Sequence, residues 1–133
     1  AVVDALRAYP TTPVLLSFSC NSTTQLCGGE PWAAAVELAG LLPSCIGVGI
    51  NCTAPEHIAG LLESAAGVAP HLPRFVYPNA GRVWDAVARE WLSDGVDVLP
   101  AAAVHSWRTA GACVVGGCCG LGPQAVAALA QQA

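Results

Sequence analysis

Three cysteines stand at positions where their thiols could act together. Cys118 and Cys119 follow the apolar run 112–115, which we expect to be a strand covered on both faces. Cys52 closes a similar segment, the apolar run 46–51. If both runs belong to one parallel sheet, the three thiols lie at its carboxyl edge, where α/β proteins place their sites. Three converging thiolates form a metal site, and zinc with an open fourth position fits them best.

The adjacent pair Cys118 and Cys119 sets a condition on the backbone. Neighbouring side chains of a regular strand point to opposite faces, so the pair shares one metal only where the strand breaks. Glycines at 116, 117 and 120 allow that break. The residues leave three other states open: apolar packing of the thiols, a closed zinc site with Cys20 as the fourth ligand, and a Cys118–Cys119 disulfide.

Two polar residues accompany these thiols. Thr53 is predicted to be the N-cap of a helix, whose N-terminus helps to hold a thiolate at Cys52. Asn79 ends a further predicted strand, where its amide can hydrogen-bond a substrate or a zinc ligand; a Pro-Asn-Ala-Gly turn is the alternative. Cys20 is expected to be a loop thiol, and the remaining cysteines are expected to pack or to be incidental.

The pattern of apolar runs predicts four strand–helix units in series. Strands are expected at 14–19, 46–51, 74–77 and 112–115. Helices are expected at 2–8, 31–42, 53–66, 83–93, 101–109 and 123–131. Each helix is long enough to be a crossover between parallel strands, so we expect an α/β fold of four parallel strands with helices outside.

Composition excludes several classes of function. The 133 residues are one domain or part of one, with 54% hydrophobic and 11% charged residues and a net charge of −4. Arginine is the only basic residue besides histidine, so no nucleic-acid partner is expected. No apolar run reaches the roughly 20 residues of a membrane span. Because the seven cysteines suggest no disulfide framework and no signal peptide is visible, we predict a cytoplasmic protein.

Three motifs follow successive predicted strands in a fixed order. They are Gly49-Ile50-Asn51-Cys52-Thr53, Tyr77-Pro78-Asn79-Ala80-Gly81 and Gly116-Gly117-Cys118-Cys119-Gly120. Together they resemble the homocysteine S-methyltransferase family. Segments 17–20 and 107–112 also resemble the family's sequence at matching places, so the resemblance covers essentially the whole chain. One departure is Leu121, where the family commonly has threonine.

The resemblance implies a fold, a metal and a reaction. The family fold is a (β/α)8 barrel of the TIM type, with zinc held by three cysteines that correspond here to Cys52, Cys118 and Cys119. The implied reaction is zinc-dependent transfer of a methyl group to the thiol of homocysteine, which gives methionine. The implied substrates are therefore homocysteine and a methyl donor. The absence of an extra donor-binding domain favours S-methylmethionine over betaine or a folate or cobalamin system, and Asn79 is the expected substrate-binding residue.

The chain is short for such a barrel, which needs about 200 or more residues. It resembles strands five to eight only, so we expect residues 1–133 to be the C-terminal half of the barrel domain, with about four β/α units. A half-barrel exposes two sheet edges and its inner face. We therefore expect an amino-terminal half-barrel or a second copy as partner. The alternative is an incomplete half-barrel that binds zinc structurally or is inactive without a partner.

Overall fold

A four-stranded parallel sheet forms the centre of the computed structural model, which describes residues 2–92 and 94–132. The strand order is β1-β2-β3-β6, formed by β1 (Val14–Phe18), β2 (Cys45–Asn51), β3 (Arg74–Tyr77) and β6 (Ala112–Val115). The helices are α1 (Val2–Leu6), α2 (Trp32–Gly40), α3 (Pro55–Ser64), α4 (Ala101–Thr109) and α5 (Pro123–Ala130). The predicted α/β class and the four parallel strands are thus confirmed. No helix in the described ranges is long and apolar enough to cross a membrane.

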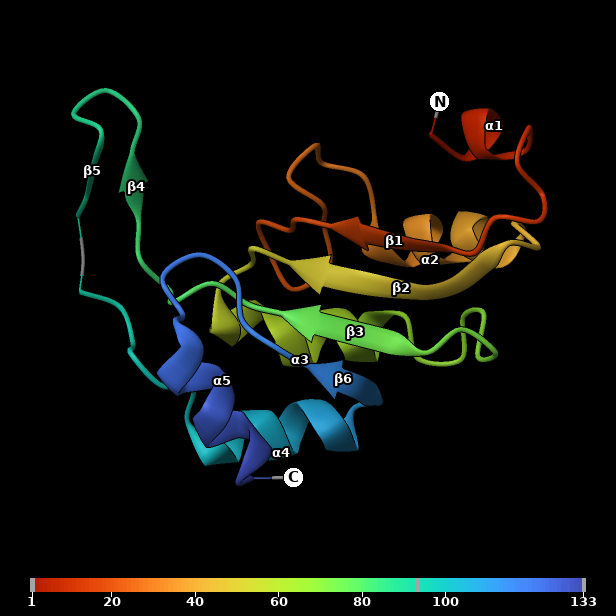
Figure 1. Cartoon of the computed structure of the whole chain (residues 1–133). Coiled ribbons are helices and arrows are strands. Elements are labelled where there is room, and N and C mark those ends of the chain that lie inside the picture. The colour runs from red at the N-terminus through yellow and green to blue at the C-terminus, as the bar shows by residue number, and fades with distance from the viewer. Residues whose placement is uncertain (1, 93, 133) are drawn as a thin grey trace.

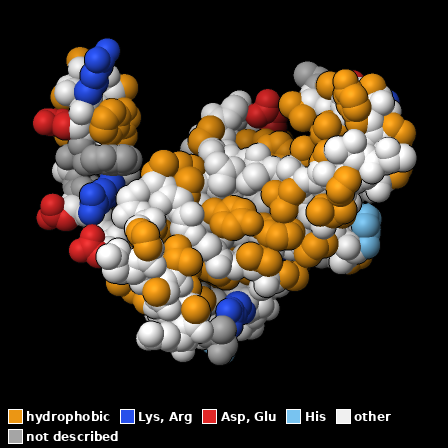
Figure 2. Space-filling model, in the orientation of Figure 1, with side chains coloured by type: hydrophobic (Ala, Val, Ile, Leu, Met, Phe, Trp, Pro, Cys, Tyr) orange, Lys and Arg blue, Asp and Glu red, His pale blue; other side chains and the backbone are white. Residues whose placement is uncertain are grey.

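The helices cover one face of the sheet and leave the other open. In Figure 1, α2 and α3 lie behind the sheet, and α4 and α5 lie beside β6. Val48, Ile50 and Val76 face this helical layer and are fully buried. On the opposite face, Leu15 and Val114 remain 38% and 41% exposed. Figure 2 shows hydrophobic side chains spread across this open face.

Strand β6 is an edge strand, which follows β3 in the sheet order and has no further neighbour among the described strands. The expectation that it is covered on both faces is wrong, because the adjacent residues Cys113 and Val114 point to opposite faces and are both exposed. Strand β1 forms the opposite edge, so both edges carry unpaired backbone groups that another strand is able to bind.

The helix predicted at 83–93 is wrong; Ser93 lies outside the described residues. The segment forms an antiparallel hairpin of β4 (Trp84–Asp85) and β5 (Glu90–Trp91). The Asp85 carboxylate accepts the backbone N–H groups of Val87 and Ala88 at 2.8 and 3.0 Å. These two donors lower the pKa of the Asp85 carboxyl, and they replace the helix with a turn, as Asp side chains often do.

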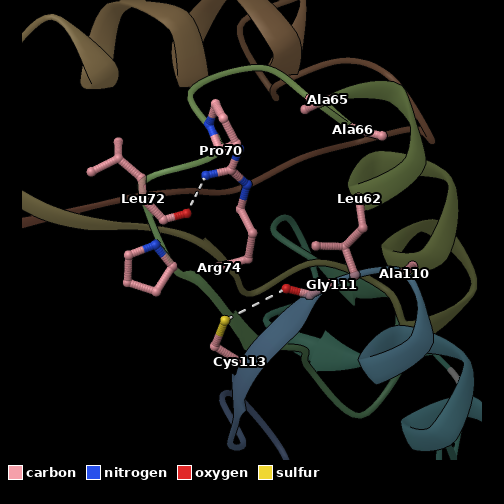
Figure 3. A pocket seen from close by; sticks show the side chains of 11 residues that line it. Leu62, Ala65, Ala66, Pro70, Leu72, Arg74, Ala110, Gly111 and Cys113 are labelled. Atoms are coloured by element: carbon pink, nitrogen blue, oxygen red, sulfur yellow. Dashed lines mark hydrogen bonds between the residues drawn. The ribbon is translucent and has the colours of Figure 1, made fainter.

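Arg74 stabilises the end of the sheet that is remote from the hairpin. Its guanidinium donates to the backbone carbonyls of Val68 and Ala69, and to that of Leu72 at 2.7 Å. Figure 3 shows this side chain between Pro70 and Leu72, in the wall of a hollow of about 200 Å³. Because the hollow lies where β3 and β6 begin, we assign it to stability, as is usual at the amino-terminal face of such sheets.

Replacing Arg74 by leucine is expected to destabilise the chain. Three carbonyls lose a charged donor, which we expect to lower the free energy of unfolding by about 2 kcal/mol. Urea denaturation followed by circular dichroism measures this loss. Arg108→Leu is the matched control, since Arg108 is exposed and donates one long bond of 3.4 Å to Gln132. Equal urea midpoints for the two variants would contradict the assignment.

Candidate metal centre

Three thiols meet at the carboxyl edge of the sheet. The Sγ atoms of Cys52, Cys118 and Cys119 all lie within 4.8 Å of one another. Cys52 and Cys119 are 3.2 Å apart, and Cys118 and Cys119 are 4.0 Å apart. The predicted proximity of these three cysteines is therefore what the structure shows, although they come from loops separated by 67 residues.

The donor set fits a thiophilic metal ion. Zinc–sulfur bonds of about 2.3 Å in a tetrahedron place neighbouring sulfur atoms about 3.8 Å apart. The separations of the Cys119 sulfur from those of Cys52 and Cys118, 3.2 and 4.0 Å, lie on either side of that value, and all three sulfur atoms are within 4.8 Å of one another. Thiolates also select soft ions over Mg²⁺ and Ca²⁺, which take oxygen ligands. Three protein ligands, rather than four, are typical of zinc sites that leave one position for a substrate.

The backbone at Cys52 is held in an unusual conformation. Its φ angle is +50°, in the left-handed region that residues with a Cβ rarely occupy. The Cys52 N–H donates to the Tyr77 carbonyl at 2.9 Å, and the Cys52 carbonyl accepts the Asn79 amide at 3.2 Å. Strand β2 therefore ends abruptly at Asn51, and the turn directs the Cys52 thiol toward the loop after β6.

Backbone hydrogen bonds join the loops that follow β2, β3 and β6. The Asn79 N–H donates to the Thr53 carbonyl at 3.1 Å, and the Cys118 N–H donates to the Pro78 carbonyl at 2.8 Å. The Ala80 N–H donates to the Cys119 carbonyl at 2.9 Å. We call this series the lateral hydrogen bonds. They continue the sheet beyond its strands and fix the two cysteine loops relative to each other.

Gly120 allows the loop after β6 to approach the loop after β3. Its φ angle is +83°, and a Cβ at this position would lie 2.7 Å from the Cβ of Ala80. That contact adjoins the bond between Ala80 and Cys119. The break that the sequence predicted after the strand is therefore present, and it places the adjacent thiols Cys118 and Cys119 beside Cys52.

The pKa values of Cys52 and Cys118 shift in opposite directions. Burial, followed by the contacts with Cys119 and Cys118, raises the pKa of the Cys52 thiol to about 12. Burial also acts to raise the pKa of Cys118, but hydrogen bonds with Cys52 and Cys119 outweigh it and the pKa is lowered. The Cys118 thiol thus ionises more readily than the Cys52 thiol, and the crowded sulfur atoms disfavour a second negative charge unless a cation is present.

Asn79 lies beside the cluster and serves its backbone. One amide hydrogen goes to the Cys52 carbonyl, and the side-chain oxygen accepts the Gly81 N–H at 2.8 Å. The predicted turn is present, and the amide reaches the backbone of Cys52 rather than its sulfur. Among the described residues, no hydrogen bond is seen for the second amide hydrogen or the second oxygen lone pair, and a role in substrate binding stays a prediction.

Cys20 is not a member of the thiol group. It is buried, its N–H donates to the Thr53 hydroxyl at 2.9 Å, and its sulfur faces the Phe18 carbonyl at 4.0 Å. Burial raises the pKa of Cys20 to about 11; the Thr53 hydrogen bond acts against this and the charge of Cys27 adds to it. A protonated, buried thiol outside the group does not favour the closed four-cysteine site.

Thr53 does not cap α3, which corrects the prediction. The N-cap is Ala54, with no side-chain cap, and Pro55 begins the helix. Thr53 is 1% exposed, and its hydroxyl donates to the Asn51 carbonyl at 3.0 Å while accepting the Cys20 N–H. The hydroxyl therefore connects the loops after β1 and β2 instead of the helix terminus.

A polar group that sequence reasoning missed lies next to the cluster. The Ser17 hydroxyl donates to the Asn51 side-chain oxygen at 2.7 Å, and the Asn51 amide donates to the Ser19 hydroxyl at 3.2 Å. The alternation Ser17-Phe18-Ser19 was the available signal, because a period of two places both hydroxyls on the same side of β1.

The whole chain is similar to known proteins of one family. The family model described as homocysteine S-methyltransferase matches residues 1–133. The chain belongs to the homocysteine S-methyltransferase family. The resemblance of the three sequence motifs is therefore confirmed.

Relatives and solved structures of this family match nearly the whole chain. The homocysteine S-methyltransferase of Escherichia coli is 36% identical over 135 residues, covering 97% of this chain and 42% of the relative. Homocysteine S-methyltransferase 4 of Zea mays is 37% identical over 122 residues, covering 90% and 35%. The apo crystal structure of the homocysteine methyltransferase MmuM from Escherichia coli has a TM-score of 0.77 at 30% identity, covering 99% and 44%.

A structure of the same MmuM in a metallated form matches equally well, with a TM-score of 0.77 and 30% identity over 99% of this chain and 40% of that one. The sheet is thus of the kind found in a homocysteine methyltransferase. The chain spans less than half the length of the relatives it matches.

Gly120→Ala is expected to disturb the thiol cluster more than a comparable glycine substitution. Gly67→Ala is the matched control, because Gly67 has a φ of +80° and no atom within 4 Å of an added Cβ. The control is expected to lose about 1 kcal/mol from backbone strain alone. Gly120→Ala has to displace Ala80 as well, so its urea midpoint falls further and the thiolate absorbance of bound Co²⁺ changes. An unchanged cobalt spectrum would contradict the role of this contact.

Cys20 is expected to resist alkylation in the folded chain. With a pKa of about 11, less than one per cent of this thiol is ionised at pH 8, and the side chain is buried. Cys27 and Cys113 are exposed and serve as internal controls. Iodoacetamide labelling at pH 8 followed by peptide mass spectrometry should modify Cys27 and Cys113 before Cys20, and equal rates would show that Cys20 is more accessible than described.

Proposed function

We propose that this chain takes part in zinc-dependent methyl transfer to the thiol of homocysteine, the reaction that gives methionine. The observation that carries the proposal is the convergence of three thiols at the carboxyl edge of the sheet in a member of this family. Cys52, Cys118 and Cys119 are the proposed ligands. Their arrangement fits a tetrahedral thiophilic ion and is poorly suited to hard cations.

The chain's own residues would orient the metal ligands and the substrate. A zinc ion held by the three cysteines would lower the pKa of the homocysteine thiol and keep its sulfur nucleophilic. The lateral hydrogen bonds hold the ligand loops in place before any substrate arrives. Asn79 is the proposed substrate-binding residue, because its amide lies at this edge and, within the part of the chain that the structure describes, has one donor and one lone pair without a hydrogen bond.

In the transfer itself, the homocysteine thiol first loses its proton to water, and the thiolate sulfur then attacks the methyl carbon of the donor. A new sulfur–carbon bond forms while the bond between that methyl group and its donor atom breaks, and the electron pair stays with the donor. We propose S-methylmethionine or a related sulfonium as donor. A sulfonium suits the step because its leaving group departs as a neutral thioether.

The open face and edges of the sheet are proposed to bind the rest of a barrel. Leu15 and Val114 remain exposed on that face, and β1 and β6 are unpaired at the edges of the described sheet. We propose that residues 1–133 act as the C-terminal half of a barrel domain, completed by an amino-terminal half or by a second copy. The cytoplasm stays the predicted location.

Zinc content tests the metal site directly. Chain purified without chelator or added metal is expected to carry about one zinc ion, measured by mass spectrometry of the metal. Cys118→Ser is expected to lose it, because two thiolates hold zinc far more weakly than three. Cys113→Ser is the matched control, because Cys113 is an exposed thiol on β6, the strand that precedes the loop of Cys118. This variant is expected to keep its zinc. Zinc retained by Cys118→Ser would refute the ligand assignment.

Methyl transfer is then assayed with homocysteine and S-methylmethionine, with and without an added amino-terminal half. Methionine formed only with the added half would support the division of the barrel. Zinc bound without any activity in either mixture would support the structural alternative.

A further inference from the structure

The left-handed turn at Cys52 needs contacts that hold it. A residue with a Cβ is strained at a φ of +50°, so the turn persists only where surrounding bonds over-determine it. Backbone bonds to Tyr77 and the amide of Asn79 hold Cys52 on the side of β3. On the side of β1, the Asn51 side chain bonds Ser17 and Ser19, and the hydroxyl of Thr53 bonds the backbone of Cys20.

The Thr53 hydroxyl donates one hydrogen bond and accepts another. Its hydrogen goes to the carbonyl of Asn51, the residue before Cys52, and its oxygen accepts the N–H of Cys20 from the loop after β1. The side chain is 1% exposed, so water does not replace either bond. Thr53 follows Cys52 in sequence, and its hydroxyl bonds Asn51, the residue before Cys52. The hydrogen bond therefore spans the turn at Cys52.

We propose that Thr53 is a positioning residue for the thiol cluster. Its hydroxyl fixes the backbone on both sides of Cys52 and so keeps the Cys52 sulfur 3.2 Å from that of Cys119. The inference rests on the proposed function in so far as the cluster is a metal site, but the positioning of the sulfur atoms is a property of the chain alone. Groups that orient metal ligands in this way commonly change metal affinity by 10- to 100-fold when they are removed.

The test compares Thr53→Val with Thr53→Ser in the 133-residue chain. Valine keeps the shape and loses both hydrogen bonds, whereas serine keeps the hydroxyl. Zinc affinity is measured by competition with a chromophoric chelator, and arsenite affinity is measured on the metal-free chain, since trivalent arsenic bonds three thiols. Thr53→Val is expected to weaken both by 10- to 100-fold, and Thr53→Ser by less than threefold.

A stability control separates positioning from general loosening. Val36→Ala removes two methyl groups from a fully buried residue of α2. It is expected to lower the urea midpoint at least as much as Thr53→Val while leaving zinc and arsenite affinity within threefold of the unmodified chain. Equal losses of affinity in Val36→Ala and Thr53→Val would overturn the proposal, as would full affinity in Thr53→Val.

The two readouts also separate this inference from the proposed function. If the unmodified chain binds arsenite tightly and zinc weakly, the zinc-dependent function fails. The positioning role of Thr53 then stands or falls with the arsenite affinities of the valine and serine variants.

Discussion

The whole site depends on one constraint, which is that the sheet continues as hydrogen bonds after its strands have ended. Parallel strands alone bring the loops near each other, but they do not set the positions of sulfur atoms to within an ångström. Here the Asn79 N–H, the Cys118 N–H and the Ala80 N–H each bond the neighbouring loop. These bonds hold the irregular backbone at this edge in fixed positions, and we call them the frame of the site. The frame also holds Cys52 in its strained conformation, with a φ of +50°.

The same frame explains the division between the two ends of the sheet. At the carboxyl end, polar side chains and thiols are exposed or half-exposed, and backbone bonds hold them. At the opposite end, the guanidinium of Arg74 bonds three carbonyls of the loop before β3. The carboxyl end thus carries the candidate metal centre, and the opposite end carries contacts that we assign to stability.

Much of this was predictable from the sequence, and the failures have physical causes. The four strands and the meeting of Cys52, Cys118 and Cys119 followed from apolar runs that end in glycine and cysteine. The segment 83–92 has the composition of a helix, but the Asp85 carboxylate bonds two N–H groups that a helix would need, and the hairpin forms instead. Thr53 looked like a helix cap because a cap and a loop contact use the same hydroxyl, and only tertiary structure decides between them. The exposure of the β6 side chains depends on which elements pack against this strand, and the local sequence pattern does not reveal those elements.

The distance along the chain between Cys52 and Cys119 has a thermodynamic consequence. Cys52 and Cys119 are 67 positions apart, and α3, β3, the hairpin, α4 and β6 lie between them, so the thiols come together only when nearly all of these elements are in place. An ion that binds all three thiols therefore binds the ordered chain and not the unfolded one. Binding of such an ion would therefore shift the folding equilibrium of the chain toward the ordered state.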